Sequence, residues 1–359
     1  MSAKRSHDTE ADGMDWFERL TGFRETSYTE TKSRLSVIDG RLHSRDTDRT
    51  YAVGTLTLPS LAELRTAAAA VRRPGRLQLS IAEGDVREMH CHPQNRGALF
   101  QVASQFNMLE MVGPTVTPED GVTRYEHDRT QGPACAMAAG AATIFRNYLV
   151  PVSGGVGQDA DRQLDGLADL SAALAQRLDV PVEKLWTMRN GYVLPTSQGL
   201  AAVNNHLRTA DTETLDELRG LLRVGLHADV EVTDGPSPGP LASQIFCSAL
   251  PVAYGRLPPS TWAPFASLVL EAAYEATLLA ARLNAARGSS DRVLLTRLGG
   301  GAFGNDDAWI DQALLRALQC AGYDLDIAVV SYGPPSRNLR DLVQKANEDL
   351  GSGGGIPPQ

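Results

Sequence analysis

A glycine-dense segment late in the chain could bind an anion through its backbone N–H groups. This glycine loop comprises Gly299, Gly300, Gly301, Ala302, Phe303, Gly304 and Asn305. The apolar run Val293–Leu298 before it is typical of a strand, Ala308–Cys320 after it is typical of an amphipathic helix, and Ile327–Ser331 indicates a second buried strand. Open α/β sheets bind ligands at the carboxyl ends of their strands, where exposed N–H groups can cradle a phosphate. The loop therefore predicts a nucleotide or a phosphorylated sugar as ligand.

The glycine loop matches neither of two common phosphate-binding motifs. It lacks the Gly-Lys-Ser/Thr ending of a P-loop, and it is not a GxGxxG segment followed by an acidic residue about 20 positions on. A tight strand-to-helix connection without a ligand is the alternative. The strand before the loop and the aromatic Phe303 within it favour ligand binding.

A second polar cluster follows the strand-like run Ala98–Ala103. It contains Gln105, Asn107 and Glu110. If this strand neighbours Val293–Leu298, both clusters lie at one edge of the sheet. The amides of Gln105 and Asn107 suit ribose hydroxyls, and Glu110 could act as a general base or orient a water molecule. An ordinary polar loop is the alternative.

A third cluster, residues 125–135, precedes a stretch of small residues that is typical of a buried helix. Asp128 or Thr130 could cap that helix, and its N-terminus could face an anion. Tyr125 and Thr130 are the candidate ligand-binding residues here. Capping alone is the alternative reading, and it does not exclude binding.

Other reactive groups give weaker signals. His90-Cys91-His92 has no fourth ligand at zinc-like spacing, so no metal site is expected. There is no GxSxG motif, and Cys135 is read as a small buried side chain rather than a nucleophile. The four cysteines are widely spaced, as reduced thiols in a cytoplasmic protein would be.

Composition sets the broad class. The chain has 359 residues, 42% hydrophobic and 21% charged, with a net charge of −9. These values are typical of a globular protein and argue against general nucleic-acid binding. No apolar run approaches the roughly 18 residues that span a bilayer, so no membrane partner is expected. We expect a cytoplasmic protein without a cofactor.

The three clusters together resemble a divergent macrodomain, the fold that binds ADP-ribose. Leu79–Val86 is similar to the macrodomain strand that ends in Gly-Asp-Ile, and Leu99–Ser104 is similar to the strand Val-Asn-Ala-Ala-Asn or Leu-Asn-Phe-Ala-Ser. The glycine loop resembles the Gly-Cys-Gly-x-Phe-Gly-Asn loop of bacterial-type poly(ADP-ribose) glycohydrolases, which holds the diphosphate and the distal ribose. The resemblance implies that Asp85, next to Val86, contacts adenine and that Phe303 packs on the distal ribose.

The chain departs from that family at the catalytic centre. Residues 107–111 replace the family's Gly-Gly-Gly loop, and Thr130-Gln131-Gly132-Pro133 stands near the place of its Gln-Glu-Glu signature. The resemblance implies binding of ADP-ribose or an ADP-ribosylated substrate and hydrolysis of an N- or O-glycosidic ADP-ribosyl bond. Glu110, Asp128 and Gln131 are the catalytic candidates. The alternative is a non-catalytic reader of ADP-ribose or another NAD-derived nucleotide.

The expected fold is a three-layer α/β/α mixed sheet of macrodomain type with a large, mainly helical insertion. Strands are expected at 77–81, 97–104, 228–233, 242–250 and 293–298, and helices at 61–71, capped by Ser60, and 262–286, capped by Ser260 or Thr261. The predicted divisions are a disordered leader (1–13), an N-terminal extension (14–75), the first part of the core (77–150), an insertion of helices and a β-hairpin (151–289), the closing βαβ unit (290–335) and a C-terminal tail (336–359).

Overall fold

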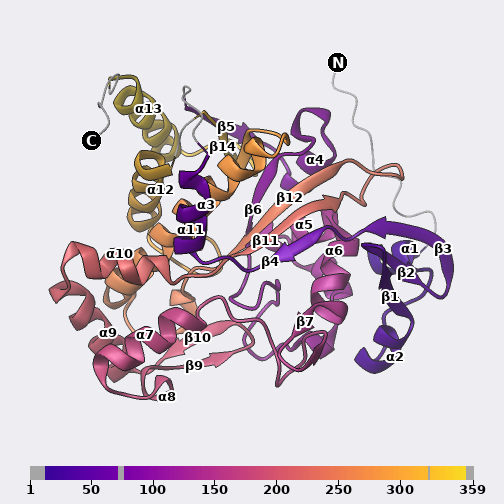
Figure 1. Cartoon of the computed structure of the whole chain (residues 1–359), viewed down its shortest axis with the longest axis horizontal. Helices are drawn as coiled ribbons and strands as arrows, with labels where there is room; N and C mark the ends of the chain where they lie inside the picture. The colour runs from indigo at the N-terminus through magenta and orange to yellow at the C-terminus, as the bar shows by residue number, and fades with distance from the viewer. Residues whose placement is uncertain (1–12, 72–76, 322–323, 353–359) are drawn as a thin grey trace.

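A seven-stranded mixed sheet forms the centre of the protein (Figure 1). The computed structural model describes residues 13–71, 77–321 and 324–352. The strand order is β4-β11-β12-β6-β13-β14-β5. These strands are β4 (Thr55–Thr57), β5 (Gln78–Glu83), β6 (Leu99–Ala103), β11 (Gly225–Glu231), β12 (Leu241–Cys247), β13 (Arg292–Leu295) and β14 (Asp326–Ser331).

The five strands from β12 to β5 run parallel, and β11 and β4 continue the sheet in antiparallel pairs. Strand β6 pairs with β13 through Val293 opposite Leu99, so the condition for the two clusters to share one edge of the sheet is met. Strand β6 also pairs with β12 up to Cys247 opposite Ala103. The carboxyl ends of β12, β6 and β13 therefore meet at one edge.

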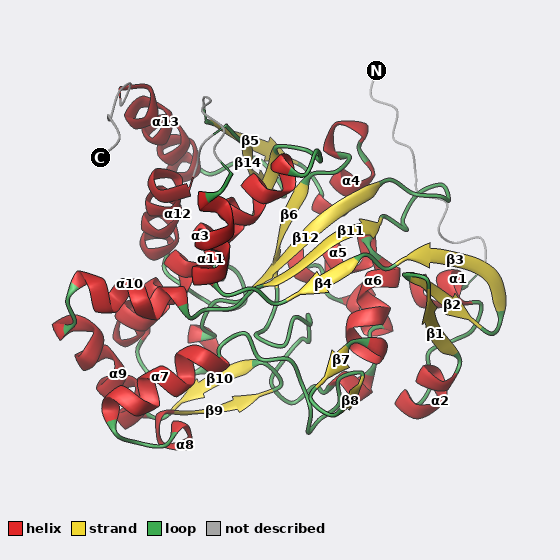
Figure 2. Cartoon of the chain, in the orientation of Figure 1, coloured by secondary structure: helices red, strands yellow, loops and turns green. Residues whose placement is uncertain are grey.

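Helices cover both faces of the sheet, as Figure 2 shows. One face packs against α3 (Leu61–Ala69), α11 (Ala263–Ala286), α12 (Asp307–Ala321) and α13 (Arg337–Ser352), and the other against α4 (Val86–Cys91) and α5 (Gln131–Ala138). Successive side chains of β6 point to opposite faces of the sheet. Leu99 packs in the hydrophobic core on the α11 side, and Phe100 packs in the core on the α4 and α5 side. The predicted three-layer α/β/α mixed sheet is confirmed.

The ends of two helices test the predicted caps. Ser60 accepts the N–H of Glu63 and Glu63 accepts the N–H of Ser60, so the predicted cap of α3 is confirmed as a capping box. The predicted cap of α11 is wrong. A 3₁₀ turn, η6 (Pro259–Trp262), leads into the helix, and Trp262, which has no acceptor side chain, occupies the cap position.

Helix α11 is the longest element of the core. Within the described residues, Pro259–Ala286 is the one helical stretch long and apolar enough to cross a membrane, yet 78% of its most apolar window is buried inside the protein. It packs most extensively against α12 and α3. This stretch is therefore a core helix in one of the two helical layers that cover the sheet.

The chain termini differ in part from the predicted divisions. The segment expected to be a tail contains α13, which packs on β5 at the sheet edge. Most of the leader expected at 1–13 and the last residues, 353–359, lie outside the described part of the chain.

The N-terminal residues form a lobe beside the layer that contains α4 and α5. It holds α1 (Trp16–Thr21), α2 (Tyr28–Ser33) and a three-stranded sheet of β1 (Leu35–Ile38), β2 (Arg41–Ser44) and β3 (Thr47–Ala52). Apolar side chains of the lobe pack against α6 (Gly140–Ile144) and against η4 (Phe145–Leu149), a single π-helical turn. Strand β4 carries the chain from this lobe into the main sheet (Figure 1).

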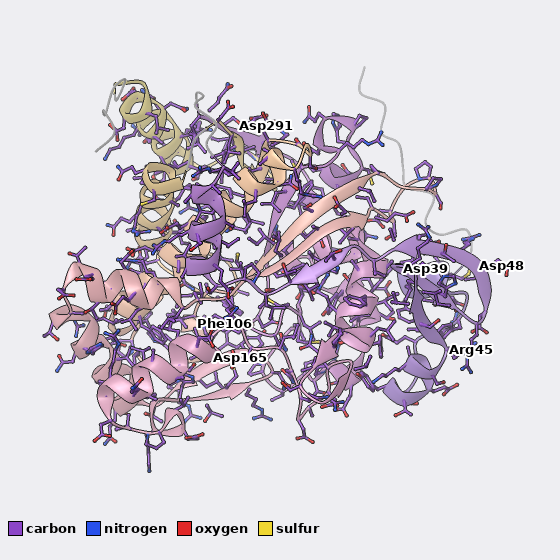
Figure 3. All side chains as sticks on the ribbon, viewed as in Figure 1. Asp39, Arg45, Asp48, Phe106, Asp165 and Asp291 are labelled. Atoms are coloured by element: carbon purple, nitrogen blue, oxygen red, sulfur yellow. The ribbon has the colours of Figure 1, made fainter. Side chains whose placement is uncertain are left out.

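Residues 151–222 form a second lobe at the carboxyl end of the sheet. It contains β7 (Pro151–Val152), β8 (Gly155–Val156), α7 (Ala168–Leu178), α8 (Val182–Leu185), the hairpin β9 (Trp186–Arg189) and β10 (Tyr192–Pro195), α9 (Ser197–Thr209) and α10 (Thr212–Gly220). The N–H of Gly166 donates to the carbonyl of Phe106 at 2.8 Å, and the N–H of Phe106 donates to the carbonyl of Gly191 at 3.1 Å. Figure 3 shows Phe106 next to Asp165 at this junction. The lobe thus holds the segment that leads to Glu110.

Candidate active site

A cavity of about 720 Å³ opens at the carboxyl ends of β6 and β13. This central cavity brings together residues of all three polar clusters predicted from the sequence. Its lining residues are Ala103, Ser104, Gln105, Glu110, Met111, Val112, His127, Asp128, Arg129, Thr130, Gln131, Gly132, Pro133, Tyr192, Ala249, Tyr254, Thr296, Arg297, Leu298, Gly299, Gly301, Ala302 and Phe303. Its size lies within the roughly 300–1,000 Å³ of typical ligand pockets.

The glycine loop presents unused hydrogen-bond donors to the central cavity. Over residues 13–71, 77–321 and 324–352, no acceptor is found for the N–H groups of Gly299, Gly301, Ala302 and Phe303. All four residues line the cavity. Clustered free N–H groups of this kind form an anion-binding concavity.

Three other residues of the predicted loop hold its shape instead of lining the cavity. The N–H of Gly300 donates to Arg297, that of Gly304 to Gly301, and that of Asn305 to Gly299. The Asn305 side-chain amide also donates to the carbonyl of Leu250 at 2.8 Å. These bonds close the turn and leave the four intervening N–H groups free.

A second set of free donors lies at the start of α5. The N–H groups of Gln131 and Gly132 have no acceptor among the described residues, and no side chain caps the helix. A Cβ atom at Gly132 would stand 2.1 Å from the carbonyl oxygen of Ala103, so only glycine lets the helix approach the end of β6 this closely. A helix N-terminus favours an anion through its free N–H groups and its dipole.

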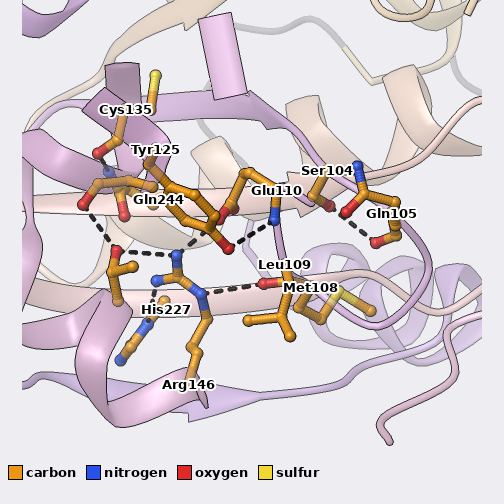
Figure 4. Close-up of polar contacts among 12 residues, drawn as sticks. Ser104, Gln105, Met108, Leu109, Glu110, Tyr125, Cys135, Arg146, His227 and Gln244 are labelled. Carbon is orange, nitrogen blue, oxygen red and sulfur yellow. Dashed lines mark hydrogen bonds and ion pairs between the residues drawn. The ribbon is translucent and has the colours of Figure 1, made fainter. Parts of the chain in front are cut away.

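Glu110 lines the central cavity, and its carboxyl group is buried next to Arg146 and Tyr125 (Figure 4). The residue is only 3% exposed, and its own N–H donates to the hydroxyl of Tyr125 at 3.0 Å. Oε1 lies 3.4 Å from Nη2 of Arg146, whereas Oε2 is buried without a hydrogen-bond donor. A buried carboxylate oxygen with an unused acceptor site is poised to bind a hydroxyl or a water molecule.

Burial raises the pKa of Glu110 to about 7, although the charge of Arg146 and the hydroxyl of Tyr125 act in the opposite direction. Desolvation penalises the ionised form, and it outweighs the attraction of one guanidinium 3.4 Å away. A carboxyl group with a pKa near the working pH can both donate and accept a proton.

Glu110→Gln should stabilise the protein at pH 8 and change its stability little at pH 5. The folded pKa of about 7 exceeds the ordinary 4.5, so the stabilising effect of the neutral carboxyl is complete below pH 4.5 and is lost as the pH rises through 7. A shift of this size corresponds to at most about 3 kcal/mol at pH 8. Urea unfolding of the variant and of Glu126→Gln at both pH values tests this. An equal gain at pH 5 would point to a cause other than ionisation.

Three aromatic rings form another wall of the cavity. The ring centroid of Phe303 lies 5.3 Å from that of Tyr192 and 5.7 Å from that of Tyr254. The Tyr192 hydroxyl donates to the carbonyl of Met111 at 2.6 Å, so the hairpin is fixed to the segment that carries Glu110. Such a wall suits a nucleobase or the apolar face of a sugar.

The sequence interpretation did not assign Tyr192, Tyr254 or Arg146 to the site. Tyr192 and Tyr254 come from the region predicted as an insertion, and Arg146 lies in a small-residue stretch that reads as buried helix. A charged residue in such a stretch is the one signal that pointed to Arg146, since buried charges need partners.

Several predicted site residues have structural partners that occupy their polar groups. The Gln131 side chain accepts the N–H of Ala103 and donates to the carbonyl of Gln101 at 2.8 Å, which fixes α5 to β6. Asn107 is fully buried, bonds to Gln163 and does not line the cavity. Tyr125 is likewise buried and reaches the site only through Glu110.

Asp128 and Thr130 do line the central cavity but also bond to each other. Oδ1 of Asp128 accepts the N–H of Thr130 at 2.9 Å and its hydroxyl at 2.7 Å. Gln105 lines the cavity while its Oε1 accepts the N–H of Met111. These side chains shape the approach to Glu110.

The structure does not bring Asp85 and Val86 to the central cavity. Asp85 caps α4 by accepting the N–H of Arg87 at 2.8 Å and lines a separate cavity of about 810 Å³ near the N-terminal lobe. Val86, the first residue of α4, is buried in the core. The reason is topological, because β14 and β13 separate β5 from β6.

The structure also locates the cysteines and the candidate metal ligands. All four cysteines are free, with Cys135 and Cys247 buried and Cys91 and Cys320 exposed. Among the described residues, no three His, Cys, Asp or Glu side chains are arranged to hold a metal ion.

The chain resembles several solved structures of bacterial poly(ADP-ribose) glycohydrolases. The enzyme from Thermomonospora curvata is 14% identical with a TM-score of 0.40, and the match covers 90% of this chain and 96% of that one. The Deinococcus radiodurans enzyme in complex with ADP-ribose is 12% identical with a TM-score of 0.38 over 92% of this chain and 99% of that one. No protein-family model and no curated protein matches the chain. At such low identities and TM-scores, an assignment of function has to rest on the groups in the cavity.

Proposed function

We propose that the protein binds ADP-ribose and hydrolyses an ADP-ribosyl glycosidic bond in the central cavity. The observation that carries this proposal is that one cavity is lined by Glu110, whose buried Oε2 is unpaired, and by residues with two sets of free backbone N–H groups. The N–H groups suit a diphosphate, and the carboxyl group suits the reacting end of a ribose.

The free N–H groups of the glycine loop and of α5 would hold the diphosphate without a metal ion. Within the described part of the chain, one arginine at the cavity, Arg129, adds an unpaired positive charge. Arg129 is exposed at the cavity with no carboxylate within 4.0 Å among the described residues, and Arg297 is held there by Asp307 and Asp311. Arg129 thus offers a cation to the diphosphate although the whole chain carries a net charge of −9. Phe303, Tyr192 and Tyr254 supply the surface for the ring systems.

Hydrolysis would break the bond between C1 of the distal ribose and the oxygen or nitrogen of its leaving group. Glu110 in its neutral form donates a proton to that leaving atom, and the water that adds to C1 then returns a proton to the carboxylate. Glu110 in its ionised form accepts a proton from the attacking water instead and passes it to the leaving atom. A pKa of about 7 makes both forms available near neutral pH.

A reader without turnover is the second candidate function, and one observation favours it. Glycoside hydrolysis commonly uses two carboxyl groups. The central cavity is lined by Glu110 and Asp128, and the Oδ1 of Asp128 is already engaged by Thr130. A reader would use Glu110 only to bind a ribose hydroxyl.

ADP-ribose should raise the melting temperature by an amount that grows with ligand concentration, whereas ribose 5-phosphate should have a smaller effect. Calorimetric titration with ADP-ribose, AMP and ribose 5-phosphate checks binding. Chromatography of ADP-ribose released from poly(ADP-ribose) and from a mono-ADP-ribosylated protein checks turnover. Binding without release would establish the reader, and no heat at millimolar ADP-ribose would reject both functions.

A further inference from the structure

The side chain of Arg146 is completely buried behind Glu110 (Figure 4). It lies in the π-helical turn η4, a type of turn that is frequent at functional sites. Its Nε donates to the carbonyl of Met108 and its Nη2 donates to the hydroxyl of Thr143, both at 3.1 Å. The guanidinium lies 3.8 Å from the ring centroid of Phe246. These contacts fix the positive charge in one place independently of Glu110.

The ion pair between Arg146 and Glu110 differs from the closely hydrogen-bonded arginine pairs of this protein, and, unlike the other long contacts such as Arg41 with Glu231 at 3.5 Å, both of its side chains are buried. Arg65 holds Asp216 through two bonds of 2.8 and 2.9 Å, and Arg287 holds Asp229 through two of 2.5 and 2.8 Å. Arg146 makes one contact of 3.4 Å with Glu110. A buried pair that served only stability would be closely hydrogen-bonded, because desolvation of both ions has to be offset. This pair instead leaves Oε2 of Glu110 free.

We propose that Arg146 is a positioning residue: its fixed charge lets the buried carboxyl group of Glu110 ionise, and its single contact to Oε1 leaves Oε2 unpaired for the substrate. This inference rests on the proposed role of Glu110 in the central cavity. It adds that Arg146 sets the pH range in which Glu110 can act as an acid or a base.

Arg146 is the one permanent charge that faces the carboxyl group of Glu110 among the described residues. The other titratable groups near the pair are Tyr125 from η3 (Thr123–His127), Cys135 from α5 and His227 from β11. Burial raises the pKa values of Tyr125 and Cys135 far above their ordinary range. Burial and the charge of Arg146 hold the pKa of His227 well below its ordinary value. All three therefore stay neutral near pH 7.

Arg146→Met should shift the ionisation of Glu110 to higher pH by about 1–3 units, the usual effect of removing a neighbouring opposite charge. NMR of protein labelled with ¹³C at the glutamate carboxyl groups measures this, and Glu110→Gln assigns the resonance. Arg146→Lys, which keeps a positive charge, should shift the ionisation midpoint of Glu110 much less than Arg146→Met does. Arg177→Met, which removes a surface arginine paired with Glu217, is the matched control and should leave it unchanged.

The pH profile of ADP-ribosyl hydrolysis gives the second readout. The part of the pH–rate profile that reports ionisation of Glu110 should shift to higher pH by the same amount as the NMR midpoint. This holds whether the ionised or the neutral form is active. An unshifted midpoint in a folded Arg146→Met protein overturns the inference. Arg146→Gln, whose amide can still donate to the carbonyl of Met108, provides the same test if the Met variant does not fold. A shifted midpoint in a protein without hydrolytic activity keeps the inference about Arg146 and rejects the hydrolytic function instead.

Discussion

Glu110→Gln should lower kcat for release of ADP-ribose by about 10³-fold, within the range that general acid–base catalysis contributes. The amide has nearly the same shape, and its oxygen can still accept from Arg146 in the place of Oε1. It cannot donate a proton to a leaving group or accept one from water. The Kd for ADP-ribose should therefore stay within a few-fold of wild type. Single-turnover assays and calorimetry measure the two quantities separately.

Two substitutions nearby test whether the loss is specific to Glu110. Glu126→Gln makes the same chemical change outside the cavity lining and should leave kcat unchanged. Asp128→Asn keeps an Oδ1 that can accept from Thr130, so it should have a much smaller effect than the change at Glu110. If Asp128→Asn proved as damaging as Glu110→Gln, the catalytic group would have to be reassigned.

Local sequence patterns were sufficient to predict the sheet edge and the clusters that meet there. The glycine loop, the run before it and Leu99–Ala103 each carry their signal within a few residues, and parallel strands bring their carboxyl ends together. Glu110 was predicted as a candidate because it follows such a strand. Its environment was not predictable, since Arg146 lies 36 residues away and meets it only after α6 has packed.

Where the structure places a residue differently from the sequence expectation, the cause lies in contacts between distant segments. Asp85 was assigned to the ligand site by resemblance, but the position of a residue within a sheet depends on strand order, which no local pattern encodes. Gln131, predicted as a catalytic residue, does line the cavity, but its half-buried amide is hydrogen-bonded to backbone groups of β6. Tyr192 and Tyr254 were missed because their rings meet Phe303 only through contacts between distant segments.

Gly299→Ala should weaken ADP-ribose binding by at least about 100-fold, because each hydrogen bond to a charged group contributes roughly 1.5–3 kcal/mol and several would be lost. Gly299 has a φ of +76°, and a Cβ atom there would lie 2.5 Å from Cβ of Ala249 and 2.7 Å from Nδ2 of Asn305. Relief of these contacts requires the loop to move, which turns its free N–H groups away from the diphosphate. Calorimetry with ADP-ribose measures the loss.

Gly288→Ala separates loss of the anion site from backbone strain alone. Gly288 has a similar φ of +87°, with nothing within 4 Å of an added Cβ, and it does not line the central cavity. Both variants carry the roughly 1–2 kcal/mol cost of a left-handed alanine, so both should melt at a lower temperature than wild type. Only Gly299→Ala should lose affinity for ADP-ribose. Equal affinities in the two variants would mean that the glycine loop is a connection between β13 and α12 and that the diphosphate binds elsewhere, with the free N–H groups of α5 as the remaining anion site.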